Sequence, residues 1–309
     1  MGNVLVKISR NQNLSMPMRK NFTLSFVIVA LVVAFGSCRK FEGDQSIPAY
    51  LRIDSASLQT DYSQFGSNTH KITDSWVYVN DQLIGAFEHP ATFPVLARGD
   101  NKLEIRPGIK LNGISATRVP YPFYRPFILT DFTFFEDSIV SVSPEFIYYD
   151  NTLIPWKEDF EDISISLEKT ARSDTTIRKT APHDPDAYSS EHSAYSGLIH
   201  LKGSVKAFQI ATAESFALPG LGRPVFLEID YKCDKPFGVG LIVEEFGTIT
   251  FLPLVIVNTS EIWNKIYINL GPNISLYSSS ARFKPYFEGN LDSEEEARFF
   301  FDNIKLVHR

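Results

Sequence analysis

The chain has few cysteines and none of the short motifs that mark common catalytic sites. Only Cys38 and Cys233 occur among its 309 residues, which excludes a disulfide-rich scaffold. No His-Glu-x-x-His, Gly-x-Ser-x-Gly, glycine-rich phosphate loop or EF-hand loop is present. Sustained helical periodicity is also missing, which argues against a helical bundle. We therefore expect a non-catalytic protein built from β-strands.

Long hydrophobic runs are missing except near the N-terminus. Residues 24–35 form one apolar run of about a dozen residues, short of the ~20 that a membrane-spanning helix requires. Two cations, Arg19 and Lys20, precede the run, and two small residues follow it directly before Cys38. This order is typical of a secretory signal peptide covering residues 1–37.

The end of this segment, Phe35-Gly36-Ser37-Cys38, resembles the lipobox of bacterial lipoproteins. The resemblance implies cleavage before Cys38 and acylation of its thiol and new N-terminus, although Phe35 stands where leucine is usual. Cys233 would then have no partner for an intrachain disulfide. Residues 1–17 fit no part of a signal peptide, which leaves open that Met16 or Met18 is the true start.

Residues 38–46 read as a short lipidated tether. Their acidic residues, Glu42 and Asp44, loosely resemble the surface-export signal of Bacteroidota lipoproteins. This implies a protein anchored in the outer membrane by its lipid, on the periplasmic or the cell-surface side, with a preference for the surface.

Positive charge is scarce once the signal peptide is removed. The whole chain has 30 Lys and Arg against 36 Asp and Glu, and four of the basic residues but no acidic residue lie before Cys38. The mature chain therefore carries a net charge of −10, which argues against nucleic acid as a partner.

Aromatic and turn-forming residues are abundant, with 25 Phe, 13 Tyr, 18 Pro and 17 Gly. Short alternating segments separated by turns predict an antiparallel β-sandwich over residues 47–150. Within it, residues 77–85, 94–96 and 99–105 resemble PEGA-type modules, which implies a non-catalytic envelope module.

A second β-sandwich is predicted over residues 157–309, after a linker at residues 151–156. Asp159-Phe160-Glu161, Ala194 to Gly197, Trp263 and Phe301 to Ile304 follow one another in the order found in jelly rolls. This order resembles galactose-binding-like and carbohydrate-binding modules. The resemblance implies a glycan or an envelope protein as partner. It also implies a structural calcium held by Glu161 and Asp302; the alternative is an acidic pair that only caps strands. No other cofactor is expected.

Tyrosine-rich loops supply the candidate contact residues. Three prolines near residues 119–127 keep that segment extended, so an aromatic patch there could contact a glycan or a protein. A buried crossing that closes the first sandwich is the alternative. The candidates for ligand or partner contact are Tyr121, Phe123, Tyr124, Tyr188 and Tyr195.

Other reactive side chains have simpler interpretations. Cys233 belongs to an alternating strand and is expected to be inert core. His183 and His192 flank a loop with three carboxylates, which predicts either a solvated loop or a metal or acid–base site. Ser55, Ser138 and Thr175 match a short Bacteroidota O-glycosylation pattern.

These observations predict a lipid-anchored, non-catalytic envelope protein that binds a glycan or a protein partner. The alternative is a structural accessory subunit of an outer-membrane complex for uptake, secretion or protein assembly.

Overall fold

The computed structural model describes residues 47–291 and 296–309, and Ile47–Arg309 form one compact unit. The lipobox, Cys38 and the tether over residues 38–46 lie outside the described residues, as do residues 292–295. Among the residues described, no helix is long and apolar enough to cross a membrane.

The chain before residue 150 consists of short strands and one helical turn. These elements are β1 (Ala49–Ile53), β2 (Ser57–Leu58), α2 (Tyr62–Phe65), β3 (Asp74–Val79), β4 (Gln82–Glu88), β5 (Ala91–Val95), β6 (Gly99–Lys110), β7 (Arg118–Pro120), β8 (Phe127–Phe134), β9 (Ile139–Ser141) and β10 (Glu145–Phe146). The largest sheet has the order β4-β3-β6-β7, with β8 also paired to β6. Two smaller sheets, β5-β1-β9 and β10-β2, contain parallel pairs, β1 with β9 and β2 with β10.

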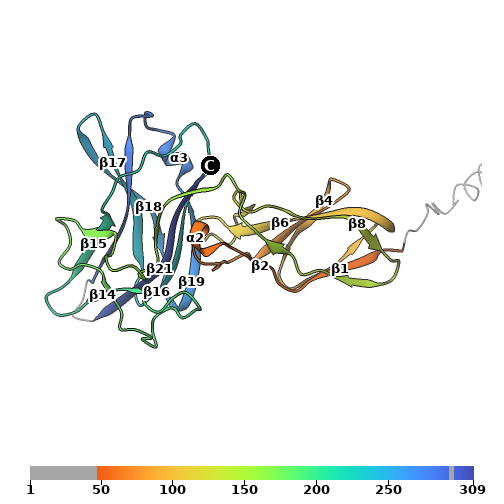
Figure 1. Cartoon of the computed structure of the whole chain (residues 1–309), viewed down its shortest axis with the longest axis horizontal. Helices are drawn as coiled ribbons and strands as arrows, with labels where there is room; N and C mark the ends of the chain where they lie inside the picture. Colours follow the sequence, from red (N-terminus) through yellow and green to blue (C-terminus); the bar gives the residue numbers. More distant parts are fainter. Residues whose placement is uncertain (1–46, 292–295) are drawn as a thin grey trace, which may run out of the picture. The chain divides into compact units, whose positions relative to one another are not determined.

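The later part of the chain forms two further antiparallel sheets (Figure 1). Its elements are β11 (Leu153–Glu158), β12 (Leu167–Lys169), β13 (Arg178–Lys179), β14 (Gly197–Leu201), β15 (Ala207–Thr212), β16 (Val225–Cys233), β17 (Phe237–Glu245), β18 (Thr248–Val257), β19 (Ser260–Asn269), α3 (Gly271–Ile274), β20 (Arg282–Asn290) and β21 (Ala297–His308). One sheet has the order β13-β14-β21-β16-β19, with β11 paired to β21, and we call it the first sheet. The other has the order β12-β15-β20-β17-β18, and we call it the second sheet.

The predicted all-β fold class is confirmed, because the described chain is mostly strand and its two helices are single turns. The parallel pairs are a departure from a purely antiparallel arrangement. They arise because the chain, after strands β3 to β8, places β9 beside β1 and β10 beside β2 in the same direction. The domain boundary at residues 151–156 remains a prediction.

Two large hydrophobic clusters support these sheets. One fills the space between the first and second sheets and includes Cys233 and Phe301. The other lies in the earlier part of the chain, yet it also contains Phe226, Tyr267 and Val307 from the first sheet. The outer face of the first sheet is therefore partly covered by the earlier part of the chain.

Strand β16 shows how this covering works. Its alternate residues Leu227, Ile229, Tyr231 and Cys233 belong to the core between the sheets, as their period of two predicts. Of the residues between them, Glu228 and Asp230 are also buried, at 0% and 3% exposure, and Lys232 is half-buried. Both faces of this strand are thus removed from water.

The buried charges on that face compensate one another. Lys265 Nζ lies 3.1 Å from Asp230 Oδ1 and 3.4 Å from Glu228 Oε2. Burial lowers the pKa of Lys265, but the attraction of Asp230 and Glu228 raises it by more, so the ammonium stays charged. Glu228 Oε1 also accepts hydrogen bonds from the Tyr121 and Tyr148 hydroxyls at 2.6 and 2.9 Å.

Cys233 is buried at 2% exposure, and burial raises the pKa of its thiol to about 11. Its Sγ lies 3.7 Å from the carbonyl oxygen of Asn258. A protonated, enclosed thiol is a poor nucleophile, in keeping with a packing role.

Replacing Gly240 with alanine is expected to destabilise the second sheet. An added Cβ would overlap the Tyr286 ring and lie 2.5 Å from the carbonyl oxygen of Leu252. We expect a loss of about 1–3 kcal/mol in the free energy of unfolding, as for other overpacked sites, measured by urea denaturation. The control is Gly220→Ala, where the nearest atom to an added Cβ is 3.9 Å away. Equal stability of the two variants would contradict this prediction.

Candidate functional site

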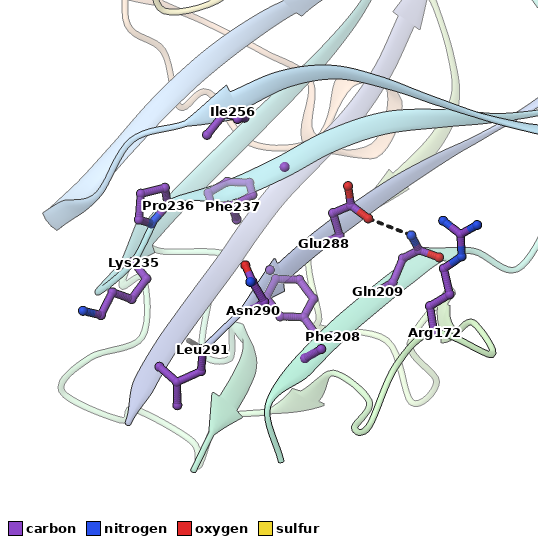
Figure 2. Close-up of a pocket in the computed structure, with 13 residues that line it drawn as sticks. Arg172, Phe208, Gln209, Lys235, Pro236, Phe237, Ile256, Glu288, Asn290 and Leu291 are labelled. Carbon is purple, nitrogen blue, oxygen red and sulfur yellow. Dashed lines mark hydrogen bonds between the residues drawn. The ribbon is translucent and has the colours of Figure 1, made fainter. Parts of the chain in front are cut away.

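The outer face of the second sheet carries a hollow of about 550 Å³ near the start of β15 and β17. Four strands of the sheet, β15, β17, β18 and β20, and the segments beside them contribute to its wall (Figure 2). Its lining residues are Arg172, Ala207, Phe208, Gln209, Lys235, Pro236, Phe237, Gly238, Ile256, Glu288, Gly289, Asn290 and Leu291.

Glycine keeps the floor of this hollow open. Gly238 lies opposite Glu288 in the ladder between β17 and β20. A Cβ on Gly238 would come within 3.1 Å of the Glu288 Cγ, so a side chain there would crowd the carboxylate. Since Gly238 has none, the Glu288 carboxylate keeps free space beside it.

Hydrogen bonds orient the polar groups of the hollow. Gln209 Nε2 donates to Glu288 Oε2 at 2.8 Å, and the Thr170 hydroxyl donates to Gln209 Oε1 at 2.7 Å. Figure 2 shows the Gln209 amide directed at Glu288, with Arg172 beside Gln209. The Arg172 guanidinium lies over the Phe251 ring, 4.3 Å from its centroid. The Glu288 Oε1 atom accepts no hydrogen bond from any residue that the structure describes.

This arrangement is suited to binding polar molecules. A carboxylate oxygen can accept from a hydroxyl, and the remaining amide and guanidinium N–H groups can donate to one. Ile256 is 76% exposed and adds an apolar wall beside them. Within residues 47–291 and 296–309, no group of three His, Cys, Asp or Glu side chains is placed to hold a metal ion.

The predicted aromatic patch at residues 119–127 is corrected by the structure. Tyr121, Phe123 and Tyr124 are 2%, 0% and 2% exposed and belong to the earlier hydrophobic cluster. Tyr121 packs edge-on against Phe226 of β16, at 5.3 Å between ring centroids. These three rings have no free surface for a ligand, and their placement matches the alternative of a buried crossing.

Tyr188 and Tyr195 remain half-buried, but neither lines the hollow on the second sheet. The Tyr188 ring packs edge-on against Trp263, at 5.5 Å and 84°. The Lys179 ammonium lies 5.2 Å from the centroid of the Tyr195 ring. Their role as contact residues stays a prediction.

Glu161 and Asp302, the predicted calcium pair, both bind groups of the protein itself. Glu161 Oε1 accepts from the backbone N–H groups of Ala194 and Tyr195 at 2.8 and 2.9 Å. Asp302 Oδ2 accepts from the Ser196 and Ser193 hydroxyls at 2.6 and 3.2 Å. Burial raises the pKa of Asp302 to about 8. Asp302 lies inside β21 and Glu161 in the segment after β11, and a calcium ion held by the pair stays a prediction.

The two histidines of the loop over residues 182–192 do not converge on a common centre with its carboxylates. His192 is exposed and packs against Tyr62, with ring centroids 4.5 Å apart. Asp186 is occupied by ion pairs with Lys232 and Arg298, both at 2.6 Å. These ion pairs therefore hold the loop against the first sheet.

The three candidate O-glycosylation positions differ in exposure. Ser55 and Ser138 are exposed, and Thr175 is half-buried. Modification at any of them remains a prediction.

The residues of the hollow were missed by sequence reasoning. Gln209 and Glu288 are 79 positions apart and meet only through the pairing of β15 with β20. The one local signal was the pair of glycines at the start of β17, which is unusual within a strand.

Comparison with known proteins gives a distant structural likeness. No family model matches the sequence, and no curated protein matches it. A family 61 carbohydrate-binding module in complex with β-1,4-galactotriose shares 14% identity, covering 46% of this chain and 87% of that module, with a TM-score of 0.30. A family 11 module of a Clostridium thermocellum cellulase shares 11% identity over 52% of this chain and 95% of its own, with a TM-score of 0.35. A structure of carbohydrate-binding modules from the β-sandwich superfamily shares 11% identity, covering 75% of this chain and 84% of its own, with a TM-score of 0.34. The chain is thus distantly similar to the β-sandwiches of carbohydrate-binding modules.

The Asp302 carboxyl is expected to make stability fall as pH rises. Its folded pKa of about 8 exceeds the unfolded value of ~3.9, so the folded state retains a proton that the unfolded chain releases. This stabilisation is complete below pH ~4 and is lost as the pH approaches 8, with a slope of at most about 1.4 kcal/mol per pH unit. Asp302→Asn removes the titrating group and should flatten the curve of unfolding free energy against pH. Parallel curves for the variant and the wild type would contradict the assignment.

Proposed function

We propose that this protein is a lipid-anchored, non-catalytic cell-envelope protein that binds a glycan through the hollow on the second sheet. The observation that carries the glycan proposal is the Glu288 carboxylate, which is oriented by Gln209 and has one oxygen free in an open hollow. Sugar hydroxyls are donors and acceptors at once, so they match a wall that offers a carboxylate, an amide and a guanidinium. The lipid anchor is supported by the lipobox-like sequence ending at Cys38.

A second candidate function, an accessory subunit of an outer-membrane complex, is favoured by β18. This strand is at the edge of the second sheet and exposes Ile249 and Ile256 at 64% and 76%. An unpaired edge with exposed apolar side chains is suited to adding a strand from another protein. This candidate would be favoured if the protein co-purified in a stable complex with other envelope proteins and bound none of the glycans tested.

Glycan binding is tested by calorimetric titration of the purified chain. The first probes are β-1,4-galactotriose, xylohexaose, cellohexaose and a β-1,3-1,4-mixed-linked tetrasaccharide, the sugars present in similar structures. Glu288→Ala should weaken binding at least about tenfold, since a hydrogen bond to a charged group contributes roughly 1.5–3 kcal/mol.

The matched control is Glu168→Ala. Glu168 lies on β12 of the same sheet and pairs with Lys284 at 3.2 Å, away from the hollow. The Glu168→Ala variant should bind the oligosaccharides as tightly as the wild type does. Equal weakening by both substitutions, or no binding by the wild type to any probe, would contradict the proposal.

The lipid anchor is tested by metabolic labelling with an alkyne fatty acid. The wild-type chain should incorporate the label and fractionate with membranes, because several acyl chains each contribute about 0.8 kcal/mol per buried CH₂. Cys38→Ser should lose both properties, while Cys233→Ser should retain them. Labelling that survives Cys38→Ser would refute acylation at this residue.

A further inference from the structure

A second hollow, of about 660 Å³, lies on the outer face of the first sheet. Its walls come from five separate segments: β2, the turn region around residues 68–71, Tyr188 in the loop before β14, Asp230 of β16, and the start of β19. Asp230 of β16 reaches it from the buried charge cluster. The hollow shares no lining residue with the one on the second sheet.

Asp230 has an unmet hydrogen-bonding capacity in this hollow. It is 3% exposed, and its Oδ1 faces the Lys265 ammonium at 3.1 Å. Its Oδ2 is buried and has no hydrogen-bond partner within the described chain. Because a buried acceptor without a donor is costly, this oxygen favours a ligand that donates a hydrogen bond.

Trp263 supplies an apolar ring beside Asp230. Its indole N–H already donates to the Asp186 carbonyl oxygen at 3.1 Å, so the nitrogen is occupied within the protein. Tyr188 packs edge-on against the indole at 5.5 Å, and Phe300 supports it at 6.4 Å. The ring is thus fixed in position, half-buried, and contributes its carbon surface to the hollow.

The charges in the hollow select among ligand classes. An anion is disfavoured because it would face the free oxygen of Asp230. An organic cation is disfavoured because the ammonium groups of Lys71 and Lys265 are among the lining residues. Burial lowers the pKa of His70, so this imidazole adds no charge at neutral pH.

The remaining lining groups suit a neutral molecule with several hydroxyls. Thr69, Asn68 and Asn264 offer hydroxyl and amide groups around the same space. Lys71 Nζ holds the Asn264 side-chain oxygen, and the Asn264 amide nitrogen donates to the Tyr231 hydroxyl at 3.0 Å. The Asn264 amide is therefore held in one orientation.

We propose that this second hollow binds one ring of a neutral sugar, with its C–H face on Trp263 and a hydroxyl donating to Asp230 Oδ2. This site goes beyond the proposed function, since it lies on the other sheet and does not require the Glu288 hollow to bind anything. Two independent sugar sites would let one chain hold two points of a glycan, which raises the effective affinity without new contacts.

The experiment is an NMR titration of the purified full chain, following the indole N–H signals of its three tryptophans. The probes are methyl β-D-glucopyranoside, methyl β-D-galactopyranoside and methyl β-D-xylopyranoside at millimolar concentration, each a single neutral ring. At least one should shift the Trp263 signal saturably and leave the Trp76 and Trp156 signals in place. No shift with any of the three, or a shift with tetramethylammonium or inorganic phosphate in their place, would overturn the proposal.

Variants locate the site and separate it from folding defects. Asp230→Asn should weaken the saturable shift about tenfold or more, the equivalent of ~1.4 kcal/mol. Because Asp230 also pairs with Lys265, a second variant leaves the cluster intact: Asn68→Trp, at an exposed lining position, fills the hollow and should abolish the shift. Unchanged binding by a folded Asn68→Trp chain would also overturn the proposal.

Glu288→Ala separates this site from the other hollow. It should retain the full Trp263 shift even if it abolishes oligosaccharide binding at the second sheet. Loss of the Trp263 shift in this variant would show that the two hollows are one coupled site and would overturn the claim of independence.

Discussion

The buried charge cluster of Glu228, Asp230 and Lys265 is the interaction on which the arrangement of the later strands depends. Its carboxylates come from β16 and its ammonium from β19, so the cluster ties two neighbouring strands on their outer face. Burying any one of these charges alone would be strongly unfavourable, and removing one partner of such a set costs roughly 3–5 kcal/mol. Tyr121 and Tyr148 of the earlier part of the chain stabilise the cluster further, because both donate a hydrogen bond to Glu228 Oε1.

Those two tyrosines explain why a loop rich in proline and aromatic residues lies where it does. The Tyr121 hydroxyl donates a hydrogen bond to Glu228, while its ring packs against Phe226, two residues away on β16. Lys305 of β21 adds a second cation on the same face, where burial lowers its pKa to about 8 and its ammonium binds the Ser67 carbonyl oxygen at 2.6 Å. Hydrogen-bonding groups and aromatic rings therefore both hold the earlier part of the chain against the first sheet. This agrees with one compact unit over Ile47–Arg309.

The sequence predicted the parts of this structure that depend on local pattern. The β class followed from alternation and turn residues, and the buried set from Leu227 to Cys233 followed from a period of two. Alternation alone could not reveal that Glu228 and Asp230 are buried as well. Their covering groups, Tyr121 and Tyr148, are 107 and 80 positions away from Glu228, and nothing local to β16 encodes that contact.

The candidate sites were harder to predict for the same reason. The hollow on the second sheet needs β15, β17 and β20 side by side, and the second hollow needs five segments from both parts of the chain. The sequence predicts Tyr188 as a contact residue because it lies in a tyrosine-rich loop. It predicts Trp263, the partner of Tyr188, only as part of the jelly-roll strand order. Side-chain type was readable at each position, whereas convergence depends on strand pairing over long separations.

The outer face of β16 shows how a single strand comes to serve two purposes. Phe226 and Glu228 lie under the aromatic rings of the earlier part, Asp230 lies at the edge of that cover, and Lys232 pairs with Asp186 beyond it. Residues two apart on a strand are only ~7 Å apart, so the cover ends within one such step. Asp230 therefore has one oxygen facing Lys265 in the buried cluster and one buried oxygen without a partner within the described chain. The same contact that stabilises the fold leaves an acceptor beside Trp263, and this makes the edge of the covered region the place where a ligand can complete the network.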